Sequence, residues 1–528
     1  MSTVQTAVAV FDGRADQPRP AASSWGRWQR LGADVPIILT LAVVALLANA
    51  WNITGFPAVG DDEGTYLAQA WAIQHGEGLA HYTYWYDHPP FGWIQIAALS
   101  WLPAALLPEH LAVANGRAIM PVVTAVAVLL LYVLARRVGL NRWWSVLAGL
   151  LFTLSPLSLA LQRQVYLDNF AVVWMLAAFV LALSPRRHLW HHIAAGTCAG
   201  LAVLSKETML IVLPALVVAL WQASDPTTRK FSFAGFFSAL GLVGGIFPLF
   251  ALLKGELLPG AGHVSLVGGT LFQLQRPGSG SFLVSGSGSQ AVLGTWLNYD
   301  SFLIVAGVLG AAVSLALPRM RAPALAVVLL VVVAARPGYL PIMYVIQALP
   351  FLALCIAGTL AAGTTTVLRW RSSRPSLVRW TALALVAAAA AGLMGYVGPR
   401  WYAGDREAFT ASYNGSYLAA VTWIRDDLPH TAKSRILVDD ALWLDLVKDG
   451  SQPGAGAIWF YKLDRVDPGI NLPRGWRDLN YIVSTPIMRQ ALSGGLPNVR
   501  AALEHSALLQ TFGTGESRVE IRAVTPTS

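Results

Sequence analysis

Long apolar segments recur along most of the chain and are separated by short polar loops. Many of these segments approach the ~20 residues that a helix needs to cross the hydrocarbon core of a bilayer. The pattern therefore predicts a polytopic α-helical membrane protein with about eleven transmembrane helices. The expected spans cover residues 33–51, 112–135, 143–161, 169–184, 189–204, 207–221, 233–253, 300–317, 322–335, 339–362 and 378–398.

The two ends of the chain break this pattern. Residues 1–32 are polar and contain prolines and arginines, which predicts a disordered leader. The apolar run that follows is too long for a typical signal peptide, so we expect it to remain as the first span of a transmembrane domain over residues 33–398. Residues 399–528 instead predict a small α/β domain. Its expected strands cover residues 435–439, 479–483 and 517–524, and its expected helix covers 441–448.

The composition supports a membrane protein and gives its orientation. Only 12% of the 528 residues are charged, against about 25% in soluble domains. The net charge of +9 could suggest a nucleic-acid partner, but the basic residues fall in every second loop. Because short basic loops stay cytoplasmic, we expect a cytoplasmic N-terminus, an extracytoplasmic C-terminal domain and no nucleic acid. The high Ala, Arg and Trp content is compatible with a GC-rich bacterial source, and we expect the protein in a bacterial plasma membrane.

Two outer loops interrupt the membrane pattern. Residues 52–111 contain amphipathic stretches around 63–75 and 91–106, which we expect to form helices lying at the membrane interface. Residues 254–298 are rich in Gly and Ser. Such a mobile backbone suits a lid over a ligand, and it suits a plain flexible connector equally well.

The first outer loop contains ionisable residues that are difficult to explain without a functional role. Asp61, Asp62 and Glu63 directly follow the first span, and Tyr66 comes next on the same short helix. Ionisable groups near hydrocarbon are costly, and a carboxylate there can serve as a general base. Acidic residues also begin helices for local reasons, since the helix N-terminus favours negative charge.

A second motif in this loop is Asp87-His88-Pro89-Pro90. The paired prolines fix the backbone and hold His88 and Asp87 in a defined, extended position. A histidine in a loop is often a plain surface residue. One that two prolines hold at a membrane mouth is a better candidate for a site.

Further polar residues are expected on the same outer face. Asp168 begins a span, where ordinary helix capping is the main alternative to a role in a site. Lys206 ends a span, where snorkelling to the interface is the alternative. Cationic side chains at this face could instead contact a phosphate at the lipid surface. The candidates for that contact are Arg163, Lys206, Arg336 and the neighbouring Tyr339.

Together these motifs resemble a known family. In order, Asp62-Glu63, Asp87-His88-Pro89-Pro90-Phe91 and Arg163 with Leu167-Asp168 resemble the motifs of protein O-mannosyltransferases, family 39 of the glycosyltransferases. That family also includes bacterial lipid A aminoarabinose transferases. The resemblance covers roughly residues 33–360, including later segments at 200–206 and 341–354. The C-terminal domain does not resemble the repeat domain of the eukaryotic enzymes, which leaves a protein acceptor in doubt.

The resemblance implies a type C glycosyltransferase fold and a polyprenyl-phosphate monosaccharide as donor. Asp62 would then be the catalytic base and Glu63 would position donor or acceptor, with Asp61 as a second carboxylate beside them. The acceptor side and the rim of the site would be lined by His88, Asp87, Tyr66 and Asp168.

The implied reaction is an inverting transfer to a hydroxyl acceptor on the outer membrane face. A single phosphate needs cationic partners more than a metal, so no obligate metal or other cofactor is expected. The acceptor could be a glycan, a glycolipid, a protein or a small metabolite, and the sugar and the oligomeric state stay open. A membrane transporter or flippase of lipid-linked sugar is the main alternative, although such proteins tend to carry polar residues at the membrane midplane within repeated halves.

Overall fold

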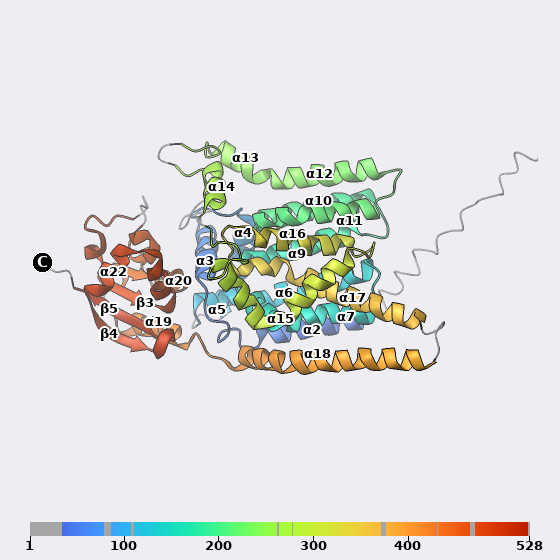
Figure 1. Cartoon of the computed structure of the whole chain (residues 1–528). Helices are drawn as coiled ribbons and strands as arrows, with labels where there is room; N and C mark the ends of the chain where they lie inside the picture. Colours follow the sequence, from blue (N-terminus) through green and yellow to red (C-terminus); the bar gives the residue numbers. More distant parts are fainter. Residues whose placement is uncertain are drawn as a thin grey trace, which may run out of the picture.

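The structure is a computed structural model of the chain. It describes residues 34–78, 86–106, 110–260, 263–276, 278–370, 376–429, 431–464 and 470–525. The expected leader, residues 1–32, lies outside these ranges. A bundle of helices forms the larger part, and a smaller α/β domain lies at one end of it (Figure 1).

Helices occupy every segment that the hydropathy pattern predicts to cross the membrane. Several of them are bent or divided into two pieces. They are α2 (Val35–Ala50), α5 (Ala112–Arg117) with α6 (Met120–Arg137), α7 (Arg142–Leu154) with α8 (Pro156–Gln162), α9 (Leu167–Ala182), α10 (Leu189–Ser205), η1 (Glu207–Val212) with α11 (Leu213–Ala223), α12 (Arg229–Gly244) with α13 (Ile246–Leu253), α15 (Gly288–Ser314), α16 (Arg321–Ala335), η2 (Ile342–Gln347) with α17 (Leu349–Trp370), and α18 (Ser376–Thr410).

Fewer of these helices qualify as spans by length and composition alone. Within the described residues, four helical segments are long and apolar enough to cross a membrane, or five if the bent pair α7 and α8 is one span. Others, such as α2 and α9, are apolar but shorter. The multi-pass character is therefore clear, whereas the number of eleven spans stays a prediction.

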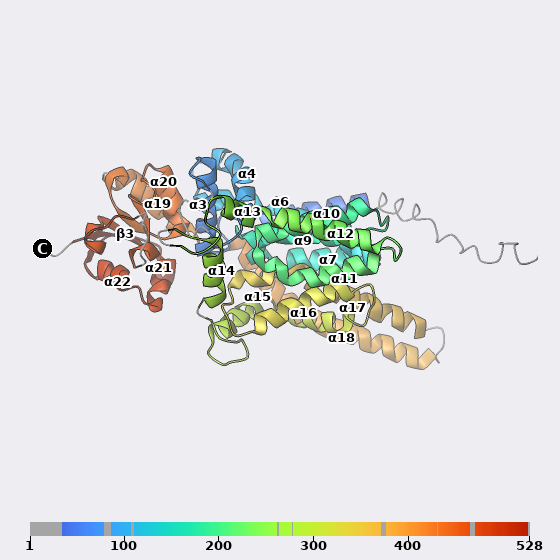
Figure 2. The same ribbon diagram turned by 90° about the horizontal axis from the view of Figure 1, so that it is seen from above.

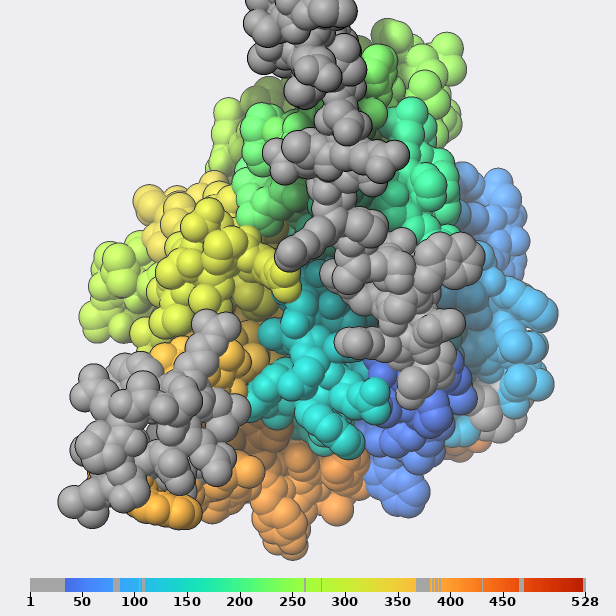
Figure 3. All heavy atoms as spheres, turned by 90° about the vertical axis from the view of Figure 1, so that its right-hand side faces the viewer, coloured from blue at the N-terminus to red at the C-terminus, as the bar shows by residue number. Residues whose placement is uncertain are grey.

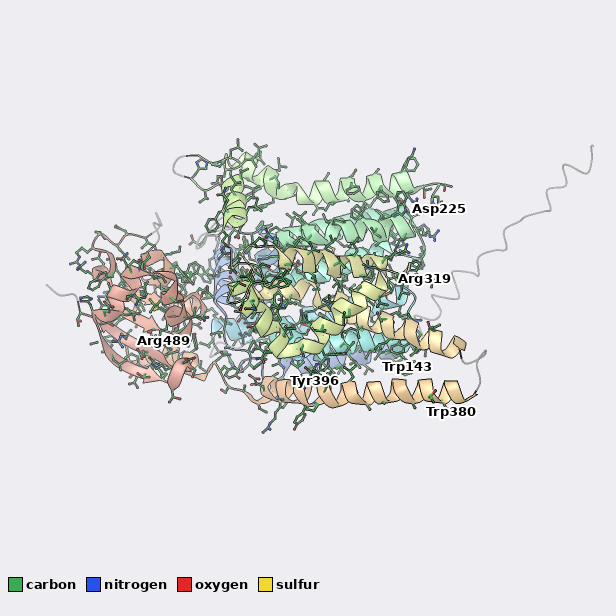
Figure 4. The ribbon with its side chains drawn as sticks, viewed as in Figure 1. Trp143, Asp225, Arg319, Trp380, Tyr396 and Arg489 are labelled. Atoms are coloured by element: carbon green, nitrogen blue, oxygen red, sulfur yellow. The ribbon has the colours of Figure 1, made fainter. Side chains whose placement is uncertain are left out.

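The bundle has two chemically different ends. Helices α3 (Asp61–Gln74), α4 (Phe91–Leu106) and α14 (Leu266–Gln275) lie at the end next to the C-terminal domain (Figure 2). The first two confirm the helices expected in the first outer loop. The loops that the sequence analysis assigned to the cytoplasm lie at the opposite end, marked by Trp143, Asp225 and Arg319 (Figure 4). Figure 3 looks onto that end, where blue, teal, green and yellow segments of the bundle meet.

The last helix of the bundle is longer than the hydropathy pattern predicts. α18 continues through Pro399 to Thr410, beyond the end expected at residue 398. The sequence analysis assigned residues 399–410 to the C-terminal domain, but a helix can continue into water once its apolar part has ended. The compact C-terminal fold begins after this helix.

The C-terminal domain is built on one mixed sheet of five strands in the order β2-β1-β3-β5-β4. β1 pairs in parallel with β2 and β3, whereas β5 pairs antiparallel with β3 and β4. The strands are β1 (Ile436–Val438), β2 (Ala457–Trp459), β3 (Tyr481–Ser484), β4 (Ser506–Phe512) and β5 (Val519–Val524). The helices are α19 (Gly415–Asp427), η3 (Thr431–Lys433), α20 (Asp440–Lys448), η4 (Phe460–Leu463), η5 (Gly475–Asp478), α21 (Pro486–Ala491), η6 (Leu492–Gly494), α22 (Pro497–Glu504) and η7 (Gly515–Ser517).

The sequence pattern identified β1, β3, β5 and α20 but not the other two strands. β2 has only three residues, which is too short for an alternating pattern. β4 is largely exposed along its whole length, so it lacks the period-two alternation that marks a half-buried strand.

Candidate active site

A cavity of about 430 Å³ lies where the outer end of the bundle meets the C-terminal domain. Its walls come from α3, the loop before α4, the start of α9, the start of η1, α14, the turn after α16, η2 and the C-terminal domain. Asp61, Asp62 and His88 therefore share one pocket. Nine of the eleven candidate residues line it, namely Asp61, Asp62, Tyr66, Asp87, His88, Asp168, Lys206, Arg336 and Tyr339.

The acidic residues at the start of α3 lie on two sides of the helix, one facing the cavity and one facing the interior of the bundle. Glu63 reaches back to accept a hydrogen bond from the amide of Gly60, at 2.9 Å, which fixes the first turn. Residues three and four apart share a helix face, so Asp62 and Tyr66 line the cavity together. Glu63 is fully buried on the other side of the helix.

The Asp62 carboxyl has the acidity expected of a general base. Burial, and then the neighbouring Asp61 charge, raise the pKa of Asp62 to about 6, although Lys206 lowers it. A base with a pKa close to the working pH is ionised yet still basic enough to accept a proton. Asp62 can therefore act near neutral pH.

His88 lies between a carboxylate and an ammonium group. Its Nδ1 is 3.1 Å from Glu207 Oε2, and its Nε2 is 3.0 Å from Lys206 Nζ. A neutral imidazole with its proton on Nδ1 satisfies both contacts, since it donates to Glu207 and accepts from Lys206. Asp87 is held by a hydrogen bond from Gln273 of α14. His88 therefore belongs to an organised polar group and is not a plain surface histidine.

The cavity also contains a cluster of cations. Lys206, Arg336 and Arg276 all line it, and the guanidinium of Arg276 lies 4.0 Å from the ring centroid of Tyr339. The sequence analysis identified Lys206 and Arg336. It missed Arg276 because nothing distinguishes that residue from other basic residues before the fold brings it to Tyr339.

The second outer loop forms part of the wall. Phe272, Gln273 and Arg276 of this loop line the cavity, and the amide of Ser279 donates to the carbonyl of Gly338 at 3.0 Å. The loop is thus fixed against the turn after α16. This arrangement favours a cover for the cavity over a plain connector.

Glu63 lies outside the cavity, among the residues that hold the bundle together. Its oxygens accept from Arg117 Nε at 2.8 Å and Nη2 at 2.5 Å, and also from the amide of Val165 at 3.0 Å. Arg117 in turn donates to the carbonyl of Pro57 at 2.7 Å. These bonds use the carboxylate fully, so a structural role replaces the positioning of donor or acceptor that the resemblance implied.

Arg163 is also outside the cavity. Its guanidinium donates to the carbonyls of Ala408 in α18, at 2.8 Å, and Ala48 in α2, at 2.7 Å. The phosphate contact expected of Arg163 therefore gives way to a structural role in which it joins three helices. The sequence does not show whether a basic residue at the outer end of a span contacts a ligand or the carbonyls of neighbouring helices.

Asp168 does line the cavity, and it is not a helix cap. The N-cap of α9 is Tyr166, and Asp168 Oδ1 accepts from Gln347 Nε2 at 2.7 Å. Gln347 also donates to Thr208 in η1. These contacts connect α9, η1 and η2 at the base of the site.

The C-terminal domain contributes directly to the walls. Trp459 and Tyr461 line the cavity, and Asp440 accepts from Thr65 Oγ1 of α3 at 2.5 Å. Burial, and next the charge of Asp61, raise the pKa of Asp440 well above its ordinary value. The sequence analysis missed these residues, since no local pattern shows that a separate domain will dock on α3.

Comparison with known proteins places this arrangement in context. The chain has the fold of the type C glycosyltransferases. Its structure superposes on ArnT from Cupriavidus metallidurans, solved with bound undecaprenyl phosphate, with a TM-score of 0.58 and 14% identity over 94% of this chain and 99% of ArnT. It superposes on the oligosaccharyltransferase of Archaeoglobus fulgidus in its apo form with a TM-score of 0.56 and 14% identity, over 93% and 75% of the two chains.

The sequence comparison agrees with the motifs. Residues 87–250 match the family model described as dolichyl-phosphate-mannose-protein mannosyltransferase. The resemblance inferred from the motifs is thereby confirmed for this part of the chain. No curated protein sequence gives a match.

Within the described residues, no group of three or more His, Cys, Asp or Glu side chains is arranged to hold a metal ion. The independence from metal that the sequence analysis expects stays a prediction, because the reaction has to be measured with and without a chelator to decide it.

Proposed function

We propose that this protein is an inverting glycosyltransferase that moves a monosaccharide from a polyprenyl phosphate to a hydroxyl group of an acceptor. The observation that carries this proposal is the presence, in one cavity, of the base Asp62 and the cationic cluster of Lys206, Arg336 and Arg276. A base and a group of cations are the two chemical requirements of a transfer that starts from a sugar phosphate.

The donor class is supported by the proteins with the same fold. ArnT of Cupriavidus metallidurans was solved with undecaprenyl phosphate, and the Archaeoglobus fulgidus oligosaccharyltransferase AglB was solved with dolichol phosphate and an inhibitory peptide, with a TM-score of 0.52 to this chain. In the present chain, Lys206, Arg336 and Arg276 can hold the phosphate of such a lipid. Arg163, although basic, is not available for this role.

The reaction then follows from the positions of the charges. The acceptor hydroxyl gives its proton to Asp62, and its oxygen forms a bond to the anomeric carbon of the donor sugar. The bond from that carbon to the phosphate oxygen breaks on the opposite face, which inverts the configuration. The lipid phosphate leaves with the electron pair, and the cationic cluster stabilises its charge without any required metal.

We place this reaction on the extracytoplasmic face of a bacterial plasma membrane. The support is the separation of the two ends of the bundle, with the cavity at one end and the basic loops at the other (Figure 4). Short basic loops favour the cytoplasm, so the cavity end faces outward.

The substitution Asp62→Asn tests the function. We expect it to reduce transfer by about 10²–10⁴-fold, because general base catalysis contributes that much, while binding of the donor lipid is kept. The measurement is the release of polyprenyl phosphate, and of labelled sugar on the acceptor, from radiolabelled lipid-linked sugar by the full chain in nanodiscs. The matched control is Asp225→Asn at the opposite end of the bundle (Figure 4).

Two outcomes contradict the proposal in different ways. Full activity in the Asp62→Asn protein refutes the assignment of the base. Movement of intact lipid-linked sugar across the bilayer by the unchanged protein, without release of polyprenyl phosphate, identifies a flippase instead of a transferase.

A further inference from the structure

The C-terminal domain is docked on α3 and on the start of α5 by close and specific contacts. A side chain added at Gly64 would place its Cβ 2.1 Å from the carbonyl oxygen of Asp440, so only glycine allows this approach of the two helices. Asp445 Oδ1 accepts from the amide of Ala112 at 2.8 Å. The rings of Trp71 and Trp443 meet edge to face, with centroids 5.9 Å apart. The domain therefore has a fixed position relative to the cavity.

This docking turns a particular edge of the sheet toward the cavity. β1 and β2 are parallel, and Val438 pairs with Trp459 at their carboxyl ends. Ligands of open α/β sheets bind in the crevice outside the carboxyl ends of the strands. Here the residues that follow β1 include Asp440, which contacts α3, and the residues at the end of β2 reach the cavity wall.

Two aromatic side chains stand at this edge. Trp459 is the last residue of β2 and Tyr461 lies in the short helix η4 that follows it, and both side chains line the cavity. Phe460 between them is fully buried. The rings of Trp459 and Tyr461 are 5.4 Å apart and almost perpendicular, at 85°. They form an aromatic corner.

The surroundings of this corner indicate its ligand. The cavity it faces also contains the carboxylates of Asp61, Asp62 and Asp87. An aromatic face carries partial negative charge and attracts the C–H groups on the face of a sugar ring, while carboxylates accept hydrogen bonds from sugar hydroxyls. Five carboxylates line the cavity against three cations, Lys206, Arg276 and Arg336. Because the proposed function assigns these cations to the donor phosphate, a second anionic ligand is disfavoured. The corner also belongs to the C-terminal domain, away from the apolar bundle, which argues against a lipid tail.

We propose that Trp459 and Tyr461 form an acceptor subsite for a neutral carbohydrate chain, which stacks a sugar ring in the aromatic corner and presents a hydroxyl group to Asp62. This inference rests on the proposed function, because it names the class of acceptor for that reaction. It assigns to the C-terminal domain the selection of the acceptor.

The test is direct binding to the full chain in nanodiscs. The probes are neutral manno-, galacto- and arabino-oligosaccharides, a sulfated oligosaccharide and a Ser/Thr-rich peptide. We expect a neutral oligosaccharide to bind and the others not to bind. Trp459→Ala and Tyr461→Ala should each weaken that binding about tenfold, and Trp459→Phe, which keeps an aromatic face, should weaken it less.

The matched control is Trp423→Ala. Trp423 packs against Phe512 in the same domain, with ring centroids 6.4 Å apart, and it is not among the residues of the cavity wall. We expect this variant to bind as the unchanged protein does. Thermal unfolding of every variant shows whether the domain still folds, and Tyr461→Ala provides a second measurement if Trp459→Ala does not fold.

Three outcomes of the binding experiment overturn the subsite. They are no binding of any neutral oligosaccharide, equal binding by the unchanged protein and both alanine variants, and tighter binding of the peptide. The Asp62→Asn protein separates the two proposals, since its amide oxygen can still accept from a sugar hydroxyl, so it should keep binding the oligosaccharide while transfer is lost. If the aromatic variants lose binding but no donor supports transfer, the proposed function fails and the subsite stands. If transfer occurs with an unchanged acceptor KM in Trp459→Ala, the subsite fails and the function stands.

Discussion

The two sides of the first turn of α3 carry the same kind of residue in opposite environments. On one side, Glu63 is surrounded by donors from Arg117, Gly60 and Val165. On the other side, Asp62 faces a cavity, and burial raises its pKa to about 6. A carboxylate whose oxygens are already fully hydrogen-bonded holds a structure together, whereas one kept beside an open space can take a proton. Two adjacent residues, Asp62 and Glu63, therefore have different roles: Asp62 can take part in the reaction, and Glu63 stabilises the fold.

The largest effect expected from this contrast is on stability. Glu63→Ala leaves the buried guanidinium of Arg117 without its carboxylate, which costs about 3–5 kcal/mol. Asp62→Asn, in the same turn, should leave the unfolding temperature almost unchanged while it removes activity. Thermal unfolding of the two variants in the same detergent measures the difference. If Asp62→Asn proves the more destabilising change, the division of α3 into a structural side and a reactive side is wrong.

A smaller effect is expected at the cationic cluster. Arg276→Ala removes one charged partner of the donor phosphate, and hydrogen bonds to charged groups contribute about 1.5–3 kcal/mol, so the donor KM should rise by about ten- to a hundredfold. The acceptor KM should stay the same. Steady-state kinetics with varied donor measures this, and Arg319→Ala at the opposite end of the bundle is the control for loss of charge (Figure 4). An equal rise for both variants would mean that the effect is only general electrostatics.

The contrast between scaffold and site also shows what a sequence can predict. The hydropathy pattern predicts the positions of the bundle helices because burial in lipid requires apolar residues. The motifs around Asp62 and His88 predict the centre of the site, because adjacent carboxylates and a proline-fixed imidazole are local features. The direction in which a single long side chain points cannot be predicted from such local features. Arg163 and Lys206 both end outer spans, yet only the packing of α2 and α18 decides that Arg163 binds carbonyls.

The residues that the sequence analysis missed have a common cause. Arg276, Trp459 and Tyr461 reach the cavity from segments that are far from the motifs in the chain. Their positions depend on the docking of α14 and of the C-terminal domain, which no local pattern encodes. The short strand β2, which carries Trp459, lacks even a strand signal.

A pH profile sharpens the assignment of Asp62. Because burial and Asp61 raise its pKa to about 6, Asp62 is an active carboxylate above that pH and a protonated acid below it. We expect kcat/KM to fall about tenfold for each pH unit below 6. Asp61→Asn removes a charge that raises this pKa, so the midpoint of the profile should move to lower pH. A midpoint that does not move would show that another group controls the profile.

The smallest effect is expected where the C-terminal domain meets α3. Burial and the charge of Asp61 raise the pKa of Asp440 in the folded protein well above its ordinary value. A raised pKa of an acid means that the folded state holds the proton more tightly, so this contribution to stability is present at low pH. It is lost as the pH rises from the unfolded pKa of about 3.9 toward the folded pKa.

Asp440→Asn fixes the neutral form and should reduce this loss. Its amide oxygen can still accept from Thr65 Oγ1, which now bonds to Asp440 at 2.5 Å. We expect the unfolding temperature to fall by about 2–4 °C less between pH 5 and pH 8 than in the unchanged protein. Asp426→Asn is the control, because Asp426 is exposed on α19 and pairs only with its neighbour Arg425 among the ion pairs of the described residues. An identical pH dependence in the Asp440→Asn protein would mean that the protonation of Asp440 contributes nothing to the docking of the domain on α3.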